Sequence, residues 1–289
     1  MRDWDDWEHI DVKANGIMLH CVTQGEGDLV VLLHGFPEFW YSWRHQIPFL
    51  ARRFKVVAPD MRGYGSSDKP ADVESYGIGS LINDVKGLIE AFGAQRAHVI
   101  GHDWGGAVAW IFAIAFPQQV EKLVVMNAPH PGIFARNLRG NLRQLLRSWY
   151  MFYFQIPGLP EASLRAGNFF LLKRAFKSWA IDKEAFSNDD LAELVAAAGA
   201  PGALTGGINY YRAMMRNTNP FKMPTEFGKI KSPTLLIWAE EDRALGKELT
   251  YGLAPYFLDE PVIRYIPECS HWVQQEQPLL VNRYLDEFL

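Results

Sequence analysis

The stretch GHDWGG at residues 101–106 places an aspartate where a short apolar run ends and an apolar helical pattern begins. Its glycines permit a sharp turn, which would hold the carboxylate of Asp103 up and exposed. A carboxylate is already ionised near neutral pH, because its unperturbed pKa is about 3.9, so it can attack carbon without a base. The competing interpretation is that Asp103 only caps the following helix.

Two further residues could form a catalytic triad with Asp103. WAEEDRAL places Asp242 just past an apolar run, and PECSHWVQ places His271 after the last such run. The chain order is nucleophile, acid, histidine, which is the order of the triad in α/β-hydrolases. The acid could also follow the run KLVVMN, but Asn127 stands there and cannot ionise. The sequence therefore favours Asp242 as the residue that orients His271.

Alternating strand and helix patterns would bring these residues to one edge of a sheet. Two alternating runs around Asn15-Gly16, within residues 9–22, predict a hairpin with a two-residue turn. Helical patterns at 80–92 and 104–116 lie between short, nearly wholly apolar runs, which are typical of buried parallel strands: 29–33, 55–59, 98–101, 122–127, 234–238 and 262–266. The predicted fold class is α/β, with ligands bound at the carboxyl ends of the parallel strands.

A long insertion interrupts this rhythm. About a hundred residues between Asn127 and Thr234 lack a good strand pattern but contain helical runs at 141–154 and 189–200. We interpret residues 132–222 as a helical lid packed over the sheet. The core would then comprise residues 1–131 and 223–289.

Composition and charge narrow the class of protein further. The 289 residues are 48% hydrophobic, enough for a sizeable core, and the formal net charge of −4 predicts no general attraction to nucleic acid or anionic membranes. Two cysteines cannot form a disulfide framework or metal cluster, and no apolar run reaches the ~20 residues that a bilayer needs. We expect a soluble, cytoplasmic protein, with a homodimer possible. We interpret one arginine-rich stretch as a solvated helix face: Arg136, Arg139, Arg143 and Arg147.

Seven motifs carry a family resemblance: HGFPE (34–38), DMRGYGSSDKP (60–70), GHDWGG (101–106), YFQIPG (153–158), NYYR (209–212), AEED (239–242) and SHW (270–272). On these motifs the chain resembles, over nearly its whole length, an α/β-hydrolase of the epoxide hydrolase type. The resemblance implies a mostly parallel, eight-stranded sheet with the lid between the sixth and seventh strands. It also implies two lid tyrosines that hydrogen-bond the epoxide oxygen. These correspond to Tyr211 and Tyr150, with Tyr153 as an alternative to Tyr150.

The resemblance implies a reaction in two steps. Asp103 would attack a saturated ring carbon and form an alkyl ester, while Tyr150 and Tyr211 donate hydrogen bonds to the departing oxygen. Water activated by His271, which Asp242 orients, would then attack the ester carbonyl and release a vicinal diol. No metal or organic cofactor is required. The expected partners are a small-molecule epoxide and water.

The backbone N–H groups of Phe36 and Trp104 match the family's oxyanion hole, and both residues would contact the substrate. The family pattern further implies a cis peptide bond before Pro37. Haloalkane dehalogenases share the aspartate chemistry, but their second halide donor is usually an asparagine where this chain has Phe36. Fluoroacetate dehalogenases place an arginine at the position of Trp104. A missing serine at position 103 disfavours an esterase, and a catalytically silent receptor on this fold stays a further alternative.

Overall fold

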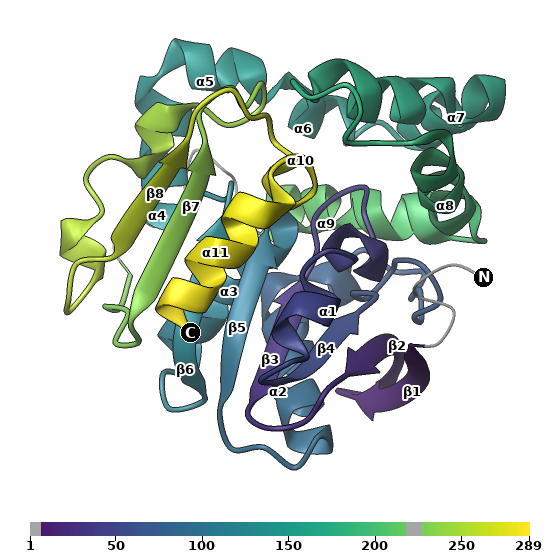
Figure 1. The fold of residues 1–289 in the computed structure, drawn as a ribbon. Helices are drawn as coiled ribbons and strands as arrows, with labels where there is room; N and C mark the ends of the chain where they lie inside the picture. Colours follow the sequence, from purple (N-terminus) through teal and green to yellow (C-terminus); the bar gives the residue numbers. More distant parts are fainter. Residues whose placement is uncertain (1–6, 218–226) are drawn as a thin grey trace.

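The computed structural model describes residues 7–217 and 227–289. An eight-stranded sheet runs through the molecule (Figure 1) in the order β1-β2-β4-β3-β5-β6-β7-β8. The pairs β1–β2 and β2–β4 are antiparallel and the remaining pairs are parallel. The strands are β1 (Glu8–Ala14), β2 (Ile17–Gln24), β3 (Leu29–Leu33), β4 (Lys55–Pro59), β5 (Ala97–His102), β6 (Val120–Met126), β7 (Thr234–Ala239) and β8 (Val262–Ile266).

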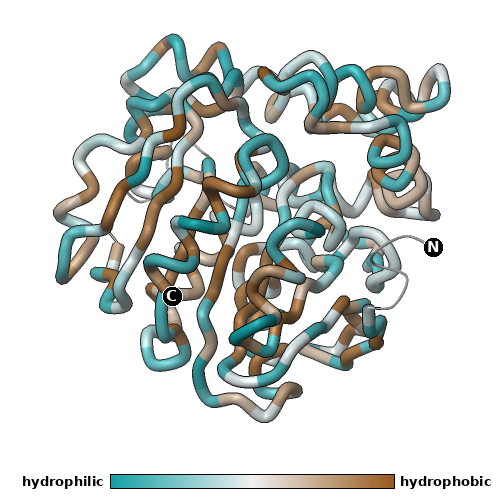
Figure 2. Tube along the Cα trace, viewed as in Figure 1, coloured by the Kyte–Doolittle hydropathy of each residue, from teal (hydrophilic) through white to brown (hydrophobic). Residues whose placement is uncertain are grey.

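Helices cover both faces of this sheet, and buried side chains alternate between them. In β3, Val31 and Leu33 pack in a cluster with α2 (Ile78–Ala91) and α3 (Trp104–Ala115). Their neighbours in β3, Val30 and Leu32, pack in a second cluster with three other helices, α1 (Ile47–Leu50), α10 (Val273–Glu276) and α11 (Pro278–Phe288). Because both faces of the inner sheet are covered, strands such as β3 and β7 are buried along their whole length and are largely hydrophobic (Figure 2).

The predicted strands and the hairpin are confirmed. β1 and β2 pair in an antiparallel register, and the two turn residues Asn15 and Gly16 have φ of 46° and 82°, as a two-residue hairpin turn requires. The six apolar runs form β3 to β8, and the predicted helices at 80–92 and 104–116 correspond to α2 and α3. Short 3₁₀ helices occur in the connections: Trp40–Trp43, Glu74–Tyr76, Lys247–Thr250 and Ala254–Tyr256.

The insertion between β6 and β7 is helical and lies over one end of the sheet (Figure 1). The predicted run at 141–154 forms two helices that separate at Ser148, whose hydroxyl lies 3.1 Å from Gln144 Nε2. The predicted upper boundary of the lid, residue 222, lies outside the described residues, so the domain limits stay a prediction. The helices of the insertion are α4 (Pro131–Gly140), α5 (Leu142–Arg147), α6 (Trp149–Tyr153), α7 (Leu159–Trp179, with non-helical geometry at 166–169), α8 (Asn188–Gly199) and α9 (Ala203–Asn217).

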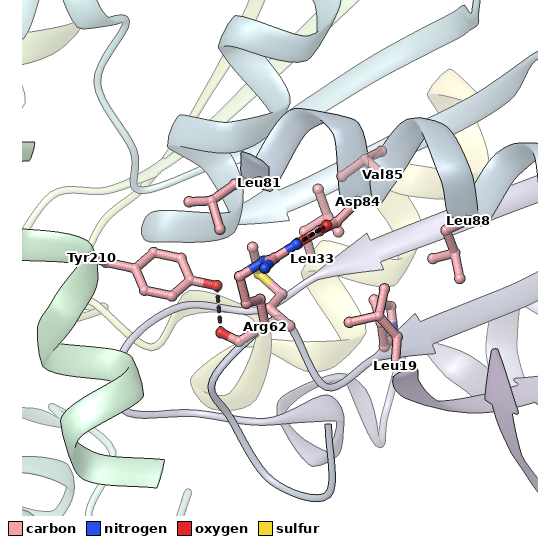
Figure 3. Close-up of a pocket in the computed structure, with 10 residues that line it drawn as sticks. Leu19, Leu33, Arg62, Leu81, Asp84, Val85, Leu88 and Tyr210 are labelled. Carbon is pink, nitrogen blue, oxygen red and sulfur yellow. Dashed lines mark hydrogen bonds and ion pairs between the residues drawn. The ribbon is translucent and has the colours of Figure 1, made fainter. Parts of the chain in front are cut away.

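A buried contact fastens α9 to the core. Figure 3 shows Tyr210 extending from α9 toward Arg62, and its hydroxyl donates a 2.8 Å hydrogen bond to the Arg62 carbonyl. Arg62 is itself held by Asp84 of α2, with a 2.6 Å ion pair. Close backbone packing adds to this contact, because a Cβ on Gly206 would overlap the carbonyl oxygen of Gly63. The core therefore fixes the position of α9, and with it the next residue, Tyr211.

Within the described part of the chain, no single helix is long and apolar enough to cross a bilayer. One bent pair, Asn188–Gly199 with Ala203–Arg216, would pass such a test on length and composition alone.

Candidate active site

Asp103 occupies a strained turn between β5 and α3. Its φ of 49° and ψ of −117° lie outside the regions that non-glycine residues favour. The turn can be this tight because Gly105 has no side chain, and a Cβ there would overlap the carbonyl oxygen of Leu33. Although Asp103 stands at the N-cap position of α3, its carboxylate makes no capping hydrogen bond. The helix-capping interpretation therefore does not account for this aspartate, and its carboxylate lines a cavity instead.

The three candidate triad residues converge at the carboxyl ends of β5, β7 and β8. His271 Nδ1 lies 2.6 Å from Asp242 Oδ2, and His271 Nε2 lies 3.6 Å from Asp103 Oδ2. Asp242 is buried, while the side chain of Asp103 is 15% exposed. One imidazole thus stands between two carboxylates, which is the arrangement that the chain order predicts.

Asp242 is held by more than the histidine. Its Oδ1 accepts hydrogen bonds from the backbone N–H groups of Ala244 and Leu245, and its Oδ2 accepts one of 2.8 Å from Asn127 Nδ2. Asn127 is fixed in turn, because its Oδ1 accepts from the Ala239 N–H at 2.9 Å. Sequence reasoning noted only that Asn127 cannot ionise and missed that it orients Asp242. A polar residue at the carboxyl end of a buried strand was the available signal.

The site sets the charge states of all three residues. Burial raises the pKa of Asp103, although the nearby His271 opposes that shift. Burial alone would lower the pKa of His271, but the charge and hydrogen bond of Asp242, with the charge of Asp103, raise it to about 9. Burial alone would raise the pKa of Asp242, but the charge and hydrogen bond of His271 outweigh burial and lower that pKa. The raised pKa of His271 therefore keeps the imidazole protonated near neutral pH, where it stands between Asp242 and Asp103.

Two backbone N–H groups face the Asp103 carboxylate. The Phe36 N–H donates to Asp103 Oδ1 at 2.9 Å, and the Trp104 N–H also interacts with this carboxylate. The peptide bond between Phe36 and Pro37 is cis, as the family pattern implies. The side chain of Phe36 lines the cavity beside Asp103, whereas that of Trp104 packs against Tyr211, with ring centroids 5.0 Å apart.

Two lid tyrosines line the same cavity from α6 and α9. The rings of Tyr150 and Tyr211 meet edge to face with centroids 5.7 Å apart. Burial, and then the negative charge of Asp103, raises the pKa of both phenols, which keeps them protonated. Tyr153 also reaches the cavity, but its hydroxyl donates a 2.7 Å hydrogen bond to Ser163 Oγ. Its proton is therefore engaged within the lid, which favours Tyr150 over Tyr153.

The cavity has a volume of about 1040 Å³ and lies between the lid and the carboxyl ends of the strands. Asp103 and His271 line it on the core side, together with Phe36 and Trp272. Aromatic and aliphatic side chains dominate the lid side: Leu142, Leu146, Trp149, Tyr150, Tyr153, Phe154, Leu164, Leu171, Leu172, Trp179 and Tyr211. Four arginines also line the cavity, Arg143, Arg147, Arg174 and Arg243, but the lining is mainly apolar and suits a largely apolar molecule.

Two buried histidines support the loops around the site. His34 Nε2 accepts the Met61 N–H at 2.9 Å, which fixes its tautomer, and its Nδ1 then donates to the Gly35 carbonyl. His102 bridges the Glu38 carboxylate and the backbone carbonyl of His271, at 2.8 Å each. In the described ranges, no group of three or more His, Cys, Asp or Glu side chains could hold a metal ion.

This fold and this site define an α/β-hydrolase. Residues 28–278 match the family model described as alpha/beta hydrolase fold, and the chain belongs to this family. The chain is 40% identical to epoxide hydrolase 4 of Mus musculus over 97% of its own length and 79% of that protein. It is 42% identical to the AB hydrolase superfamily protein YfhM of Bacillus subtilis, over 96% of each chain.

A solved structure agrees with these relatives. A mutant epoxide hydrolase from Bacillus megaterium, complexed with its product (R)-3-[1]naphthyloxy-propane-1,2-diol, superposes with a TM-score of 0.88 and 32% identity. The match covers 96% of this chain and 99% of that one. The resemblance to the epoxide hydrolases is thus confirmed, and the chain is a hydrolase.

Proposed function

We propose that this protein hydrolyses epoxides to vicinal diols through an alkyl ester on Asp103, and that helices α4–α9 serve as the lid of the site. One observation carries the proposal: two protonated lid phenols line the cavity that also holds an aspartate beside a histidine. A serine-type acyl transfer would have no use for such phenols, whereas the oxygen of an opening epoxide needs acidic donors. The kinship with epoxide hydrolases supports the same reaction.

In the first step, a carboxylate oxygen of Asp103 bonds to a ring carbon while the bond from that carbon to the epoxide oxygen breaks. The electron pair of the broken bond moves to the oxygen, where Tyr150 and Tyr211 donate hydrogen bonds and supply the proton. Burial raises the pKa of Asp103, while His271 and two backbone N–H groups favour the charged form, which is the form that attacks carbon. A poorly solvated carboxylate is the more reactive toward carbon.

In the second step, water cleaves the ester. The negative charge of Asp103 helps to hold the pKa of His271 near 9. Alkylation removes this charge, so the pKa of His271 falls and the imidazole becomes easier to deprotonate. The imidazolium gives its proton to the phenolate that the first step leaves. Neutral His271 then takes a proton from water, and the hydroxide attacks the side-chain carbonyl carbon of Asp103. The N–H groups of Phe36 and Trp104 receive the oxyanion. As it collapses, the departing diol oxygen takes the proton of the added hydroxyl group, so Asp103 returns as a carboxylate and one water has been consumed overall.

The runner-up function is carbon–halogen cleavage by the same aspartate. It is disfavoured because Phe36 offers no side-chain donor to a halide, and because lid phenols suit an epoxide oxygen better. Incubation with styrene-type and aliphatic epoxides, and in parallel with bromoalkanes and chloroalkanes, separates the functions. We expect diol from epoxides and no halide release. Halide without diol would establish a dehalogenase, and binding without either product would indicate a silent receptor. The cytoplasmic location and a homodimer stay predictions.

A further inference from the structure

Positive charge is concentrated in one part of the lid. Residues 132–180 contain eight lysines and arginines and one glutamate, a formal charge of +7, in a chain whose net charge is −4. The one acid, Glu161, is already paired with Arg212 at 2.7 Å. Because charges act over a Debye length of about 8–10 Å at physiological salt, a surface near this segment meets its local charge and not the net charge of the molecule.

Exposed apolar side chains are concentrated in the same part. The described residues include 15 large hydrophobic side chains that are exposed, and eight of these lie within residues 142–171. Leu142, Leu146 and Trp149 are each more than 60% exposed. A cluster of this kind, on one end of the molecule where α5, α6 and α7 lie (Figure 1), is typical of an interaction surface.

The two features meet at the opening of the active-site cavity. Four cavity-lining hydrophobic residues are also exposed at the surface, Leu142, Leu146, Trp149 and Leu171. Four arginines line the same cavity, three of them exposed and Arg147 half-buried: Arg143, Arg147, Arg174 and Arg243. We call these eight residues the mouth. On α5, leucines at 142 and 146 and arginines at 143 and 147 form two adjacent rows, each with the i, i+4 spacing.

Three arginines of the mouth, Arg143, Arg174 and Arg243, form no ion pair among the described residues, and Arg147 has Glu248 nearby without forming an ion pair. Asp103 is the only carboxylate among the described residues that line the cavity. An occupant of this surface must therefore supply negative charge to the arginines and apolar surface to the leucines and the tryptophan. The surface of a bilayer with anionic headgroups supplies both, with phosphate groups for the arginines and acyl chains for the leucines and the tryptophan.

We infer that the mouth docks onto an anionic lipid surface, with the cavity opening toward the lipid. Trp149 and the leucines would lie among the headgroups and upper acyl chains, and the arginines would contact phosphate groups. This peripheral docking differs from the absence of membrane attraction that net charge predicts, because the charge is distributed unevenly. It does not depend on chemistry at Asp103, so it can stand or fail separately from the proposed function.

A second copy of the chain fits the mouth less well. In a twofold dimer the same patch faces itself, so the arginines of the two copies would oppose one another without acids between them. The charge of the mouth therefore favours lipid as the occupant.

The first test measures flotation of the full chain with lipid vesicles. We expect the protein to float with vesicles that contain phosphatidylglycerol, to bind pure phosphatidylcholine vesicles at least about tenfold more weakly, and to dissociate at high salt. Equal binding to both vesicle types, or binding to neither, would overturn the inference. A dimer that forms through the mouth, without vesicle binding, would assign this surface to a second copy.

Matched variants locate the surface. The double variant Arg143→Gln with Leu146→Gln changes two exposed residues of α5, and we expect about tenfold weaker binding to anionic vesicles. The control, Arg283→Gln with Leu279→Gln, changes an arginine and an 84% exposed leucine on α11, and should bind like the unchanged protein. Equal losses in both variants would contradict docking through the mouth. Circular dichroism verifies that both variants are folded.

Orientation is tested with brominated lipids, which quench tryptophans that enter the bilayer. We expect quenching in the unchanged protein and its loss in Trp149→Phe, a variant that keeps an apolar ring and still binds vesicles. Quenching that persists in Trp149→Phe would show that another face contacts the lipid, and would overturn the inference.

Discussion

The Asp103 carboxylate and the His271 imidazole determine each other's charge across 3.6 Å. Asp103 contributes to the raised pKa of His271, about 9, and His271 in turn favours the charged form of Asp103. Each group therefore favours the charged form of the other while the nucleophile is free. Esterification ends that balance, and the same histidine can then act as a base.

This coupling predicts the pH dependence of the second step. His271 must be neutral to take a proton from water, so ester hydrolysis should accelerate as pH rises and level off above the pKa of His271 in the alkylated enzyme. That pKa should lie below the value of about 9 in the free enzyme, because the Asp103 charge is absent. Rapid-quench measurement of alkyl-enzyme decay across about pH 6 to 10 checks this. A decay rate independent of pH would show that His271 is not the base.

Single substitutions test which of two neighbouring tyrosines, Tyr150 or Tyr153, donates a hydrogen bond to the epoxide oxygen. Tyr150→Phe should slow alkylation by about a hundredfold, since it removes a donor to the epoxide oxygen, and should affect ester hydrolysis far less. Tyr153→Phe is the matched control, because the Tyr153 hydroxyl is bonded to Ser163. Burst-phase kinetics separates the two steps. A larger effect on alkylation from Tyr153→Phe would reverse the assignment.

The strands and helices show how much of this site could be predicted from the sequence. The strands were predictable because burial on both faces makes them apolar throughout, as in β3 and β7, and the strand ends then placed Asp103 and Asp242. The break between α5 and α6 at Ser148 was not predictable, because the helical pattern of the sequence continues through this residue. Tyr150 and Tyr153 lie about one helical turn apart, and only the contact of Tyr153 with α7 distinguishes them. Such contacts between distant segments leave no local pattern.

Among the helices and strands, the packing of α9 against the core is the feature to test. Gly206→Ala would push a Cβ into the Gly63 carbonyl oxygen, so we expect a loss of about 1–3 kcal/mol in stability and slower alkylation as Tyr211 shifts. Gly79→Ala is the control, because its Cβ meets open space on α2. Thermal unfolding and alkylation rates of both variants check this. An unchanged Gly206→Ala enzyme would show that α9 is not fixed by this contact.

Across the whole molecule, the sheet collects groups that are far apart in sequence. Phe36, Asp103, Asp242 and His271 come from four different connections at one end of the sheet, and the helical insertion lies over them with Tyr150 and Tyr211. The core and the lid also differ in charge, since residues 132–180 carry +7 within a chain of net charge −4. One architecture thus supplies a buried anionic nucleophile and a basic, apolar surface around its entrance.

The central claim is that Asp103 bonds covalently to the substrate. Intact-protein mass spectrometry of His271→Gln, mixed with excess epoxide, tests it most directly, because this variant retains the nucleophile and lacks the base for the second step. We expect a mass increase equal to one epoxide, located by peptide mapping on Asp103, and no increase in the variant that also carries Asp103→Asn. An unmodified His271→Gln protein that still forms diol, or an adduct on another residue, would contradict the account.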